Sequence, residues 1–260
     1  MTLAAPAPWP VLVAGLAIVF AAGIVRGYAG FGFSAISVAG LSLMVSPASV
    51  VPAIFVLEVL ASATLLRDAL RDADGRWLAA LAHGNALCIP LGILVLAHLP
   101  ETPLRLAVGA LLLALAAMQR FGLELRLQPT VVTRFAVGAA SGLANGVAAI
   151  GGIVVAVLLG PAQLAPAVLR ATLIILFLLT DVYALAWAAL LPAAEAGPLV
   201  DGATAAWALL LAPPMLIGIA LGSRAFRGAS PAAFRRRVLD LLLAVSALAV
   251  LRAALEILRQ

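Results

Sequence analysis

The chain has 260 residues, of which 65% are hydrophobic and only 10% are charged. Soluble domains average about half apolar and about a quarter charged residues, so this composition excludes an ordinary soluble domain. Several apolar runs contain the roughly 20 residues needed to cross a hydrocarbon core. The short alternating segments of a membrane β-barrel do not occur. The sequence therefore predicts an all-α polytopic membrane protein.

The charge pattern indicates membrane orientation rather than a nucleic-acid surface. All 16 cationic residues are arginine, the formal net charge is +5, and most of the arginines flank apolar runs. Such a distribution is typical of the loops of membrane proteins. We therefore expect the lipid bilayer as a partner and no nucleic acid. The opening "MTLAAPAPWP" has no basic region before its apolar run, so we expect no cleaved signal peptide.

Each half of the chain is expected to begin with a broken apolar segment and to continue with three longer ones. The first break is the glycine-rich stretch "RGYAGFG" (26–32), and the second is "SGLANG" (141–146). The expected segments are 11–25, 31–45, 48–66, 77–96 and 104–118, then 135–144, 150–160, 164–191, 203–221 and 238–258.

The two halves also share sequence. "SPASVVPAI" (46–54) aligns with "GPAQLAPAV" (160–168) at an offset of 114, which sets Pro47 against Pro161 and Pro52 against Pro166. "GALLLALA" (109–116) aligns with "DLLLAVSA" (240–247). Such duplication is common in secondary transporters. We predict one integral transport domain built from two membrane repeats, 1–122 and 130–260.

The arginines favour one of two topologies for the broken segments. A 15-residue piece reaches about 22 Å, less than the hydrocarbon core, so each broken pair either crosses once or returns to its own side. A single crossing would divide the loop arginines 8 to 6, whereas returning hairpins divide them 11 to 3. The positive-inside rule favours the second division. It predicts two inverted repeats, each a re-entrant hairpin plus three transmembrane helices, with both termini periplasmic. The 11 cytoplasmic arginines would be Arg67, Arg71, Arg76, Arg120, Arg126, Arg134, Arg224, Arg227, Arg235, Arg236 and Arg237; the other three are Arg105, Arg252 and Arg259, near Glu101, Glu195 and Asp201.

The glycine breaks predict an anion-binding site at mid-depth. Backbone that leaves the helix inside a membrane lies against protein or lines a wet cavity. Two half-helices, beginning near residues 31 and 149–152, would aim their positive N-termini at the midplane. The residues expected to form this site are Gly27, Gly30, Gly32, Ser34, Asn145, Gly151 and Gly152. The alternative is that the glycines serve only tight helix packing.

Five ionisable residues lie inside apolar segments, where such groups usually mark a pathway or a buried pair. Arg26 and Arg170 could bind an oxyanion in bidentate fashion, or Arg26 could pair with Glu58. Both are compatible if the substrate displaces the carboxylate. Glu58 and Asp181 are candidate proton carriers or fixed counterions, and His83 either titrates or is a packed neutral side chain. We expect no metal site and no cofactor.

The stretch "VGAASGLANGVAAIGGIVVAVLLGPAQLAPAV" (137–168), with "GYAGFGFSAISVAGLSLMVSP" (27–47) as its first copy, resembles the TauE/SafE sulfite exporter family. The resemblance spans nearly the whole chain, although Asn145-Gly146 and Ala148-Ala149 replace part of the family's glycine cluster. It implies export of sulfite, thiosulfate or an organosulfonate across the bacterial inner membrane.

The expected function is a secondary transporter for a small anion, working by alternating access around the midplane site. No Walker motif occurs, so we expect no ATP hydrolysis by this chain. An anion channel, a permease subunit that needs a separate ATPase, and a membrane-embedded enzyme are the alternatives. The last would need a nucleophile–base pair or a metal cluster, and no H-E-x-x-H motif occurs. A homodimer is the candidate assembly.

Overall fold

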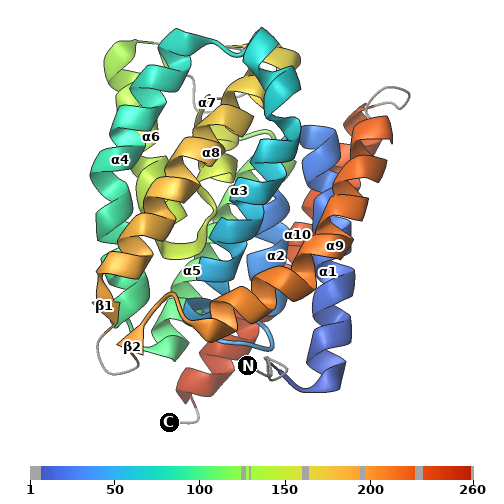
Figure 1. Cartoon of the computed structure of the whole chain (residues 1–260), viewed down its shortest axis with the longest axis vertical. Helices are drawn as coiled ribbons and strands as arrows, with labels where there is room; N and C mark the ends of the chain where they lie inside the picture. The colour runs from blue at the N-terminus through green and yellow to red at the C-terminus, as the bar shows by residue number, and fades with distance from the viewer. Residues whose placement is uncertain are drawn as a thin grey trace.

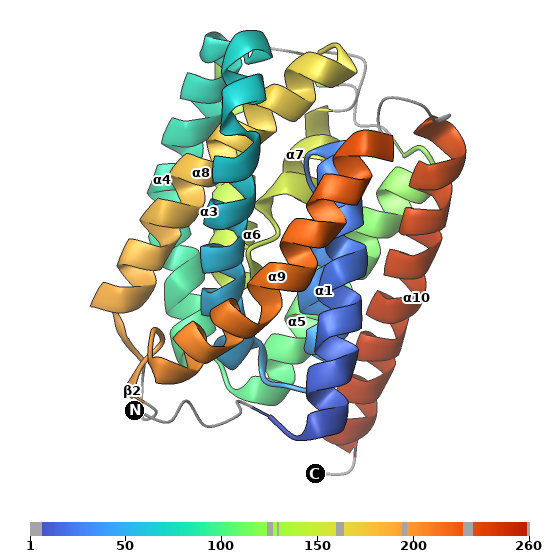
Figure 2. The ribbon, with the colours of Figure 1, turned by 45° about the vertical axis from the view of Figure 1, so that its right-hand side comes forward.

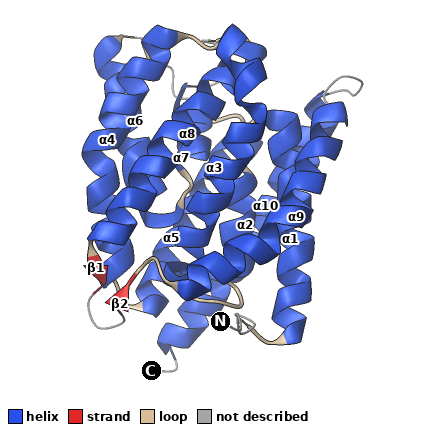
Figure 3. Ribbon diagram, viewed as in Figure 1, coloured by secondary structure: helices blue, strands red, loops and turns tan. Residues whose placement is uncertain are grey.

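The computed structural model describes residues 7–123, 127–128, 130–159, 164–193, 197–225 and 231–258. These residues form ten helices and one pair of two-residue antiparallel strands, β1 and β2, between α8 and α9 (Figures 1 and 3). The elements are α1 (Trp9–Ala29), α2 (Phe33–Leu41), α3 (Pro47–Asp72), α4 (Gly75–His98), α5 (Glu101–Arg120), α6 (Val131–Ala148), α7 (Gly151–Leu159), α8 (Pro166–Leu190), β1 (Pro192–Ala193), β2 (Gly197–Pro198), α9 (Gly202–Ala225) and α10 (Pro231–Leu258).

Eight of these helices are long and apolar enough to cross a membrane, namely all except α2 and α7. The prediction of an all-helical polytopic membrane protein is confirmed. The predicted length of the leading pieces is wrong, because α1 has 21 residues and α6 has 18, and both qualify as spans. Only α2 and α7, with nine residues each, are half-length. α1 runs into the predicted break and turns within it, at 30–32, whereas α6 runs through the predicted break 141–146 and turns at 149–150.

Successive helices alternate in direction, so that the start of α1 and the close of α10 lie at the same end of the molecule (Figure 2). We call this the terminal end. The opposite end holds the close of α3, α5 and α9 and the start of α4, α6 and α10, and we call it the arginine-rich end. The described arginines of this end are Arg67, Arg71, Arg76, Arg120, Arg134, Arg224, Arg235, Arg236 and Arg237; Arg126, Arg227, Arg259 and Glu195 lie outside the described residues.

Two helix pairs pack closely through glycines, α1 with α9 and α4 with α6. A Cβ added at Gly27 would lie 2.2 Å from the carbonyl oxygen of Ile219, and one at Gly84 would lie 2.2 Å from that of Phe135. Close helix approach through small residues is common in membranes. Gly27 lies inside α1 rather than in the turn, and it takes part in this close packing.

One separation relates the two halves of the chain. Gly30 and Ala149 are the left-handed residues that end α1 and α6, and Pro47 and Pro166 begin α3 and α8. Both pairs are 119 positions apart. The sequence alignment, which set Pro47 against Pro161, is therefore out of this register by five positions, and Pro161 lies outside the described residues.

Candidate functional site

The first turn brings the chain against α8. Gly30 and Gly32 have φ of 80° and 91°, a left-handed conformation in which a Cβ would be strained. The N–H of Gly30 donates to the carbonyl oxygen of Arg26 at 2.8 Å and closes α1. A Cβ at Gly30 would lie 2.3 Å from Cγ of Arg170. Glycine is therefore required here both for the turn and for the close approach of Arg170.

Arg26 lies in the last turn of helix α1, four residues before Gly30, and is completely buried. Its Nη1 donates to the carbonyl oxygen of Gly30 and its Nη2 to Oγ of Ser62, both at 2.6 Å. Nη2 also forms a 3.2 Å ion pair with Oε2 of Glu58. A buried charge needs such a partner, because its desolvation is otherwise uncompensated. The internal pairing of Arg26 with Glu58 is thus the arrangement that this structure contains.

The Glu58 carboxylate occupies the place expected for an anion. Glu58 is 2% exposed, and its Oε1 accepts a 3.2 Å hydrogen bond from the backbone N–H of Ser34. Ser34 is the second residue of α2, so this N–H has no partner within its own helix. One carboxylate therefore bridges a helix N-terminus and a buried guanidinium, both of which favour negative charge.

At the second turn, a side-chain amide rather than a carboxylate accepts from the N-terminus of helix α7. The N–H of Gly151 donates to Oδ1 of Asn145 at 3.3 Å, and Nδ2 of Asn145 donates to Oδ1 of Asp181 at 2.7 Å. Oγ of Ser141 donates to the carbonyl oxygen of Gly151 at 3.0 Å. The other oxygen of Asp181, Oδ2, is buried with no hydrogen-bond partner among the described residues. The buried carboxylate of the second turn is therefore held by an amide, whereas that of the first turn is paired with a guanidinium.

The two turns are built on the same spacing. Arg26 and Ser62 are 36 positions apart, as are Asn145 and Asp181, and each pair is hydrogen-bonded. The offset of 119 relates the first pair to the second and relates Glu58 to Phe177. The sequence analysis missed Ser62 and Phe177, which this offset could have found. The ring of Phe177 lies 4.8 Å from Cζ of Arg26, and a Cβ at Gly152 would lie 2.1 Å from the ring.

Arg170 reaches the same region from the arginine-rich end. Its Nη2 donates to the carbonyl oxygen of Gly27 at 3.0 Å, and its charge interacts with that of Arg26. Arg170 also lines a cavity of about 240 Å³ between the first turn, α7, the start of α8 and α10. Most of the lining is apolar, and its polar side chains are those of Tyr28, Gln119 and Arg170.

The structure does not bring His83 into this cluster. His83 is exposed on α4, and its Nδ1 contacts the carbonyl oxygen of Ala79 at 2.7 Å. The neighbouring Gly84 and Asn85 take the buried face of α4 against α6, which turns His83 outward. Within the described residues, no group of three His, Cys, Asp or Glu side chains could hold a metal ion.

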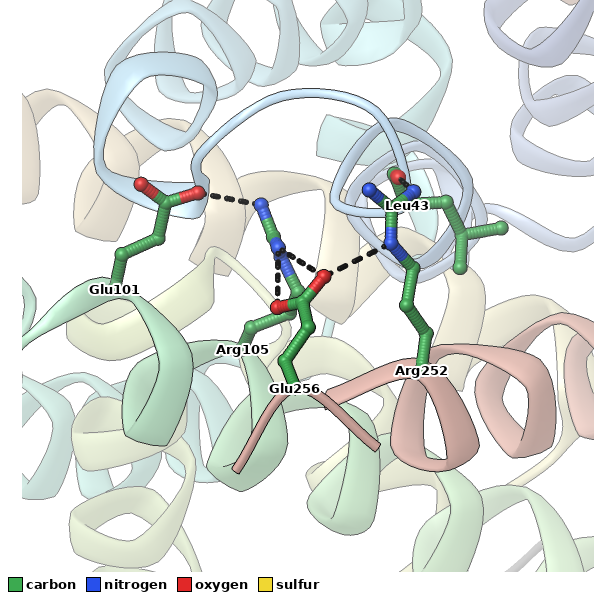
Figure 4. Close-up of polar contacts among 5 residues, drawn as sticks. All are labelled: Leu43, Glu101, Arg105, Arg252 and Glu256. Carbon is green, nitrogen blue, oxygen red and sulfur yellow. Dashed lines mark hydrogen bonds and ion pairs between the residues drawn. The ribbon is translucent and has the colours of Figure 1, made fainter. Parts of the chain in front are cut away.

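A second polar cluster fixes the far end of α2 (Figure 4). Arg105 on α5 pairs with Glu101 at 2.5 Å and with Glu256 on α10 at 3.1 Å. Glu256 also pairs with Arg252, which donates to the carbonyl oxygen of Leu43 in the turn after α2. The short helix α2 is thus held at the terminal end by this cluster and at its N-terminus by Glu58.

Eight candidate spans, two helix pairs in which the second member is half-length, and buried charges at the turns define the class of multi-pass helical membrane proteins, and such broken pairs are common among transporters. The family described as sulfite exporter TauE/SafE matches residues 15–250. The chain belongs to this family. Comparison with the curated proteins and with the solved structures gave no match.

Proposed function

We propose that the protein is a secondary transporter that exports sulfite, thiosulfate or an organosulfonate across the bacterial inner membrane. Membership of the sulfite exporter family supports the substrate class. The observation that carries the anion site is the Glu58 carboxylate, held between Arg26 and the Ser34 N–H. A place that binds one buried oxyanion has the charge and the donors to bind another.

We further propose that residues 1–122 and 130–260 are inverted repeats that move by alternating access around this site. The offset of 119 and the matched turns support the repeat. Opposite running directions support the inversion, since α1 runs toward the arginine-rich end and α6 runs away from it (Figures 1 and 2). The arginine-rich end would face the cytoplasm under the positive-inside rule, with both termini periplasmic.

The cavity beside Arg170 supports an approach from the cytoplasm. It lies near the arginine-rich end, and Arg170 connects it to the carbonyl oxygen of Gly27, one residue from Arg26. An anion leaving the cytoplasm is assisted by the membrane potential by about 2.3 kcal/mol per charge at 100 mV. That corresponds to roughly a fiftyfold outward accumulation of a monovalent anion, so export needs no proton coupling.

Sulfite efflux from liposomes that contain only the purified chain tests the proposal. We expect saturable efflux, which Arg170→Ala abolishes and Arg170→Lys partly retains. Arg67→Ala is the matched control, because Arg67 is exposed at the same end. Normal efflux in Arg170→Ala would contradict the role of Arg170. An efflux that does not saturate would favour the anion channel, and no efflux of any tested anion would contradict the transport proposal.

A further inference from the structure

Glu58 holds the ion pair with Arg26 and the hydrogen bond to the α2 N-terminus, two contacts that an external anion would need in the first half of the site. Its Oε2 is 3.2 Å from Nη2 of Arg26, and its Oε1 accepts from the N–H of Ser34 at 3.2 Å. The exposed fractions of Arg26, Glu58 and Ser34 are 0%, 2% and 6%. Since no space is left between these groups, a second anion cannot reach Arg26 while Glu58 remains there.

We propose that Glu58 is an internal competitor for the transported anion, which binds Arg26 and the N-terminus of α2 only after Glu58 has swung aside. This inference rests on the proposed function. It gives Glu58 a role different from that of a fixed counterion, which would stay on Arg26 while substrate binds elsewhere.

The donor count at Arg26 favours exchange over permanent pairing. Nε of Arg26 is buried and has no hydrogen-bond partner within the described part of the chain. Buried donors are nearly always satisfied, and an exception calls for an explanation. A carboxylate offers two oxygens to Nη2 and the Ser34 N–H, whereas an oxyanion with three terminal oxygens has one more to offer to Nε. A three-oxygen anion can therefore replace Glu58 without leaving a donor empty.

The charges around Glu58 make it the group that must give way. Arg26 on α1 is the cation that faces it, and Asp181 on α8 lies close enough for the two carboxylates to interact electrostatically. Arg170 on α8 also lies close enough to Arg26 for the two charges to interact, and its Nη2 donates to the carbonyl oxygen of Gly27. Helix α2 carries no charged residue, and apart from the half-buried Cys88 the charged or titratable residues of α4, α5 and α9 lie at helix ends or on exposed faces. Arg26 is the cation that pairs with Glu58, and an incoming anion would be a third negative charge beside Glu58 and Asp181. Moving Glu58 away removes part of that repulsion.

The test measures binding of methanesulfonate, whose charge does not change between about pH 5 and pH 8, to the purified full chain. Glu58→Gln keeps the shape of the side chain and removes its charge. If Glu58 leaves the site in less than a tenth of the wild-type molecules, this variant binds at least about tenfold more tightly at neutral pH.

Two controls separate Glu58 from the other carboxylates. Glu101→Gln removes a charge from an arginine pair at the terminal end and should bind like the wild type. Asp181→Asn leaves Glu58 on Arg26, so it should gain less affinity than Glu58→Gln, and an equal or larger gain would overturn the inference. Unchanged or weaker binding by folded Glu58→Gln would also overturn it while leaving the proposed function intact. If Glu58→Gln does not fold, the shorter carboxylate of Glu58→Asp replaces it as the test: it should hold Arg26 less well and bind the anion more tightly, and unchanged or weaker binding overturns the inference. No binding of methanesulfonate, sulfite or thiosulfate by any variant would contradict both proposals.

Discussion

The guanidinium of Arg26 lies 4.8 Å from the centre of the Phe177 ring, so a cation of the first half stacks on an aromatic side chain of the second. Phe177 is 119 positions after Glu58, the carboxylate that pairs with the same guanidinium. Equivalent positions in the two halves therefore supply different side chains to the same guanidinium. One half supplies the counterion and the other supplies an apolar, electron-rich face.

Phe177→Leu removes this stacking while keeping an apolar side chain. We expect a loss of about 1–2 kcal/mol of stability, since a desolvated cation–π contact contributes up to about 2 kcal/mol. We also expect weaker anion binding, because Arg26 loses the surface that orients it. Thermal unfolding and methanesulfonate titration in detergent measure both. Trp77→Leu is the matched control, because Trp77 also stacks on an arginine but lies outside the site. The centre of its ring is 4.3 Å from Cζ of Arg134. This variant should lower stability without changing anion affinity, and equal affinity losses would contradict an orienting role of Phe177.

Arg26→Met leaves Glu58 buried without its cation. Breaking a buried pair in this way costs about 3–5 kcal/mol, so the single variant should unfold much earlier than the wild type. Arg26→Met combined with Glu58→Gln removes the stranded charge and should recover at least half of the loss. Chemical unfolding in detergent measures the difference. Arg120→Met is the control, because the Arg120–Asp240 pair is partly exposed and should cost about 1 kcal/mol or less. If the stability lost in the double variant equals the sum of the losses in Arg26→Met and Glu58→Gln, the charge of Glu58 does not depend on Arg26 for its stability.

Gly30→Ala tests the turn that places the site. The left-handed conformation costs alanine about 1–2 kcal/mol, and the new Cβ would meet Cγ of Arg170 at 2.3 Å. We therefore expect both destabilisation and loss of transport. Gly122→Ala is the control, because Gly122 has φ of 65° but nothing within 4 Å of an added Cβ. It should show the conformational cost alone. Transport that is equally impaired in both variants would mean that the contact with Arg170 is unimportant.

Ala149→Gly tests the corresponding turn between α6 and α7 by removing a side chain rather than adding one. Among the described residues, Ala149 is the non-glycine residue with positive φ, at 57°. Glycine adopts this conformation without strain, so the substitution should raise stability by up to about 1 kcal/mol after the larger entropy of the unfolded glycine is subtracted. Thermal unfolding measures the shift. A marked destabilisation would mean that the buried methyl group contributes more through packing than the backbone strain costs.

Cysteine labelling tests the proposed orientation. Gly75→Cys at the arginine-rich end should react with an impermeant thiol reagent only from the cytoplasm, and Gly202→Cys at the terminal end only from outside. A Cβ at either glycine meets nothing within 4 Å, so both variants should fold normally. The single native cysteine, Cys88, is first replaced by alanine. Labelling of both positions from the same side would contradict the predicted topology.

The sequence by itself determined the protein class, the approximate spans and the glycine turns. Hydropathy is a local property that can be summed over a window of 20 residues, and left-handed turns require glycine at particular positions. The arginine distribution also predicted that the close of α3, α5 and α9 lies opposite the start of α1 and the close of α10, and Figure 2 shows this arrangement. Gly30 and Gly32, chosen from the sequence, have the positive φ that such turns need.

Only the tertiary structure decided which of the candidate residues meet. Glu58 and Arg26 are separated by 32 positions and become partners because α3 lies beside the turn between α1 and α2. His83, equally polar and equally deep in an apolar run, faces outward because Gly84 and Asn85 take the buried side of α4. The rotation of each helix about its axis is set by packing between distant segments, and the local sequence of a uniformly apolar helix carries little information about it.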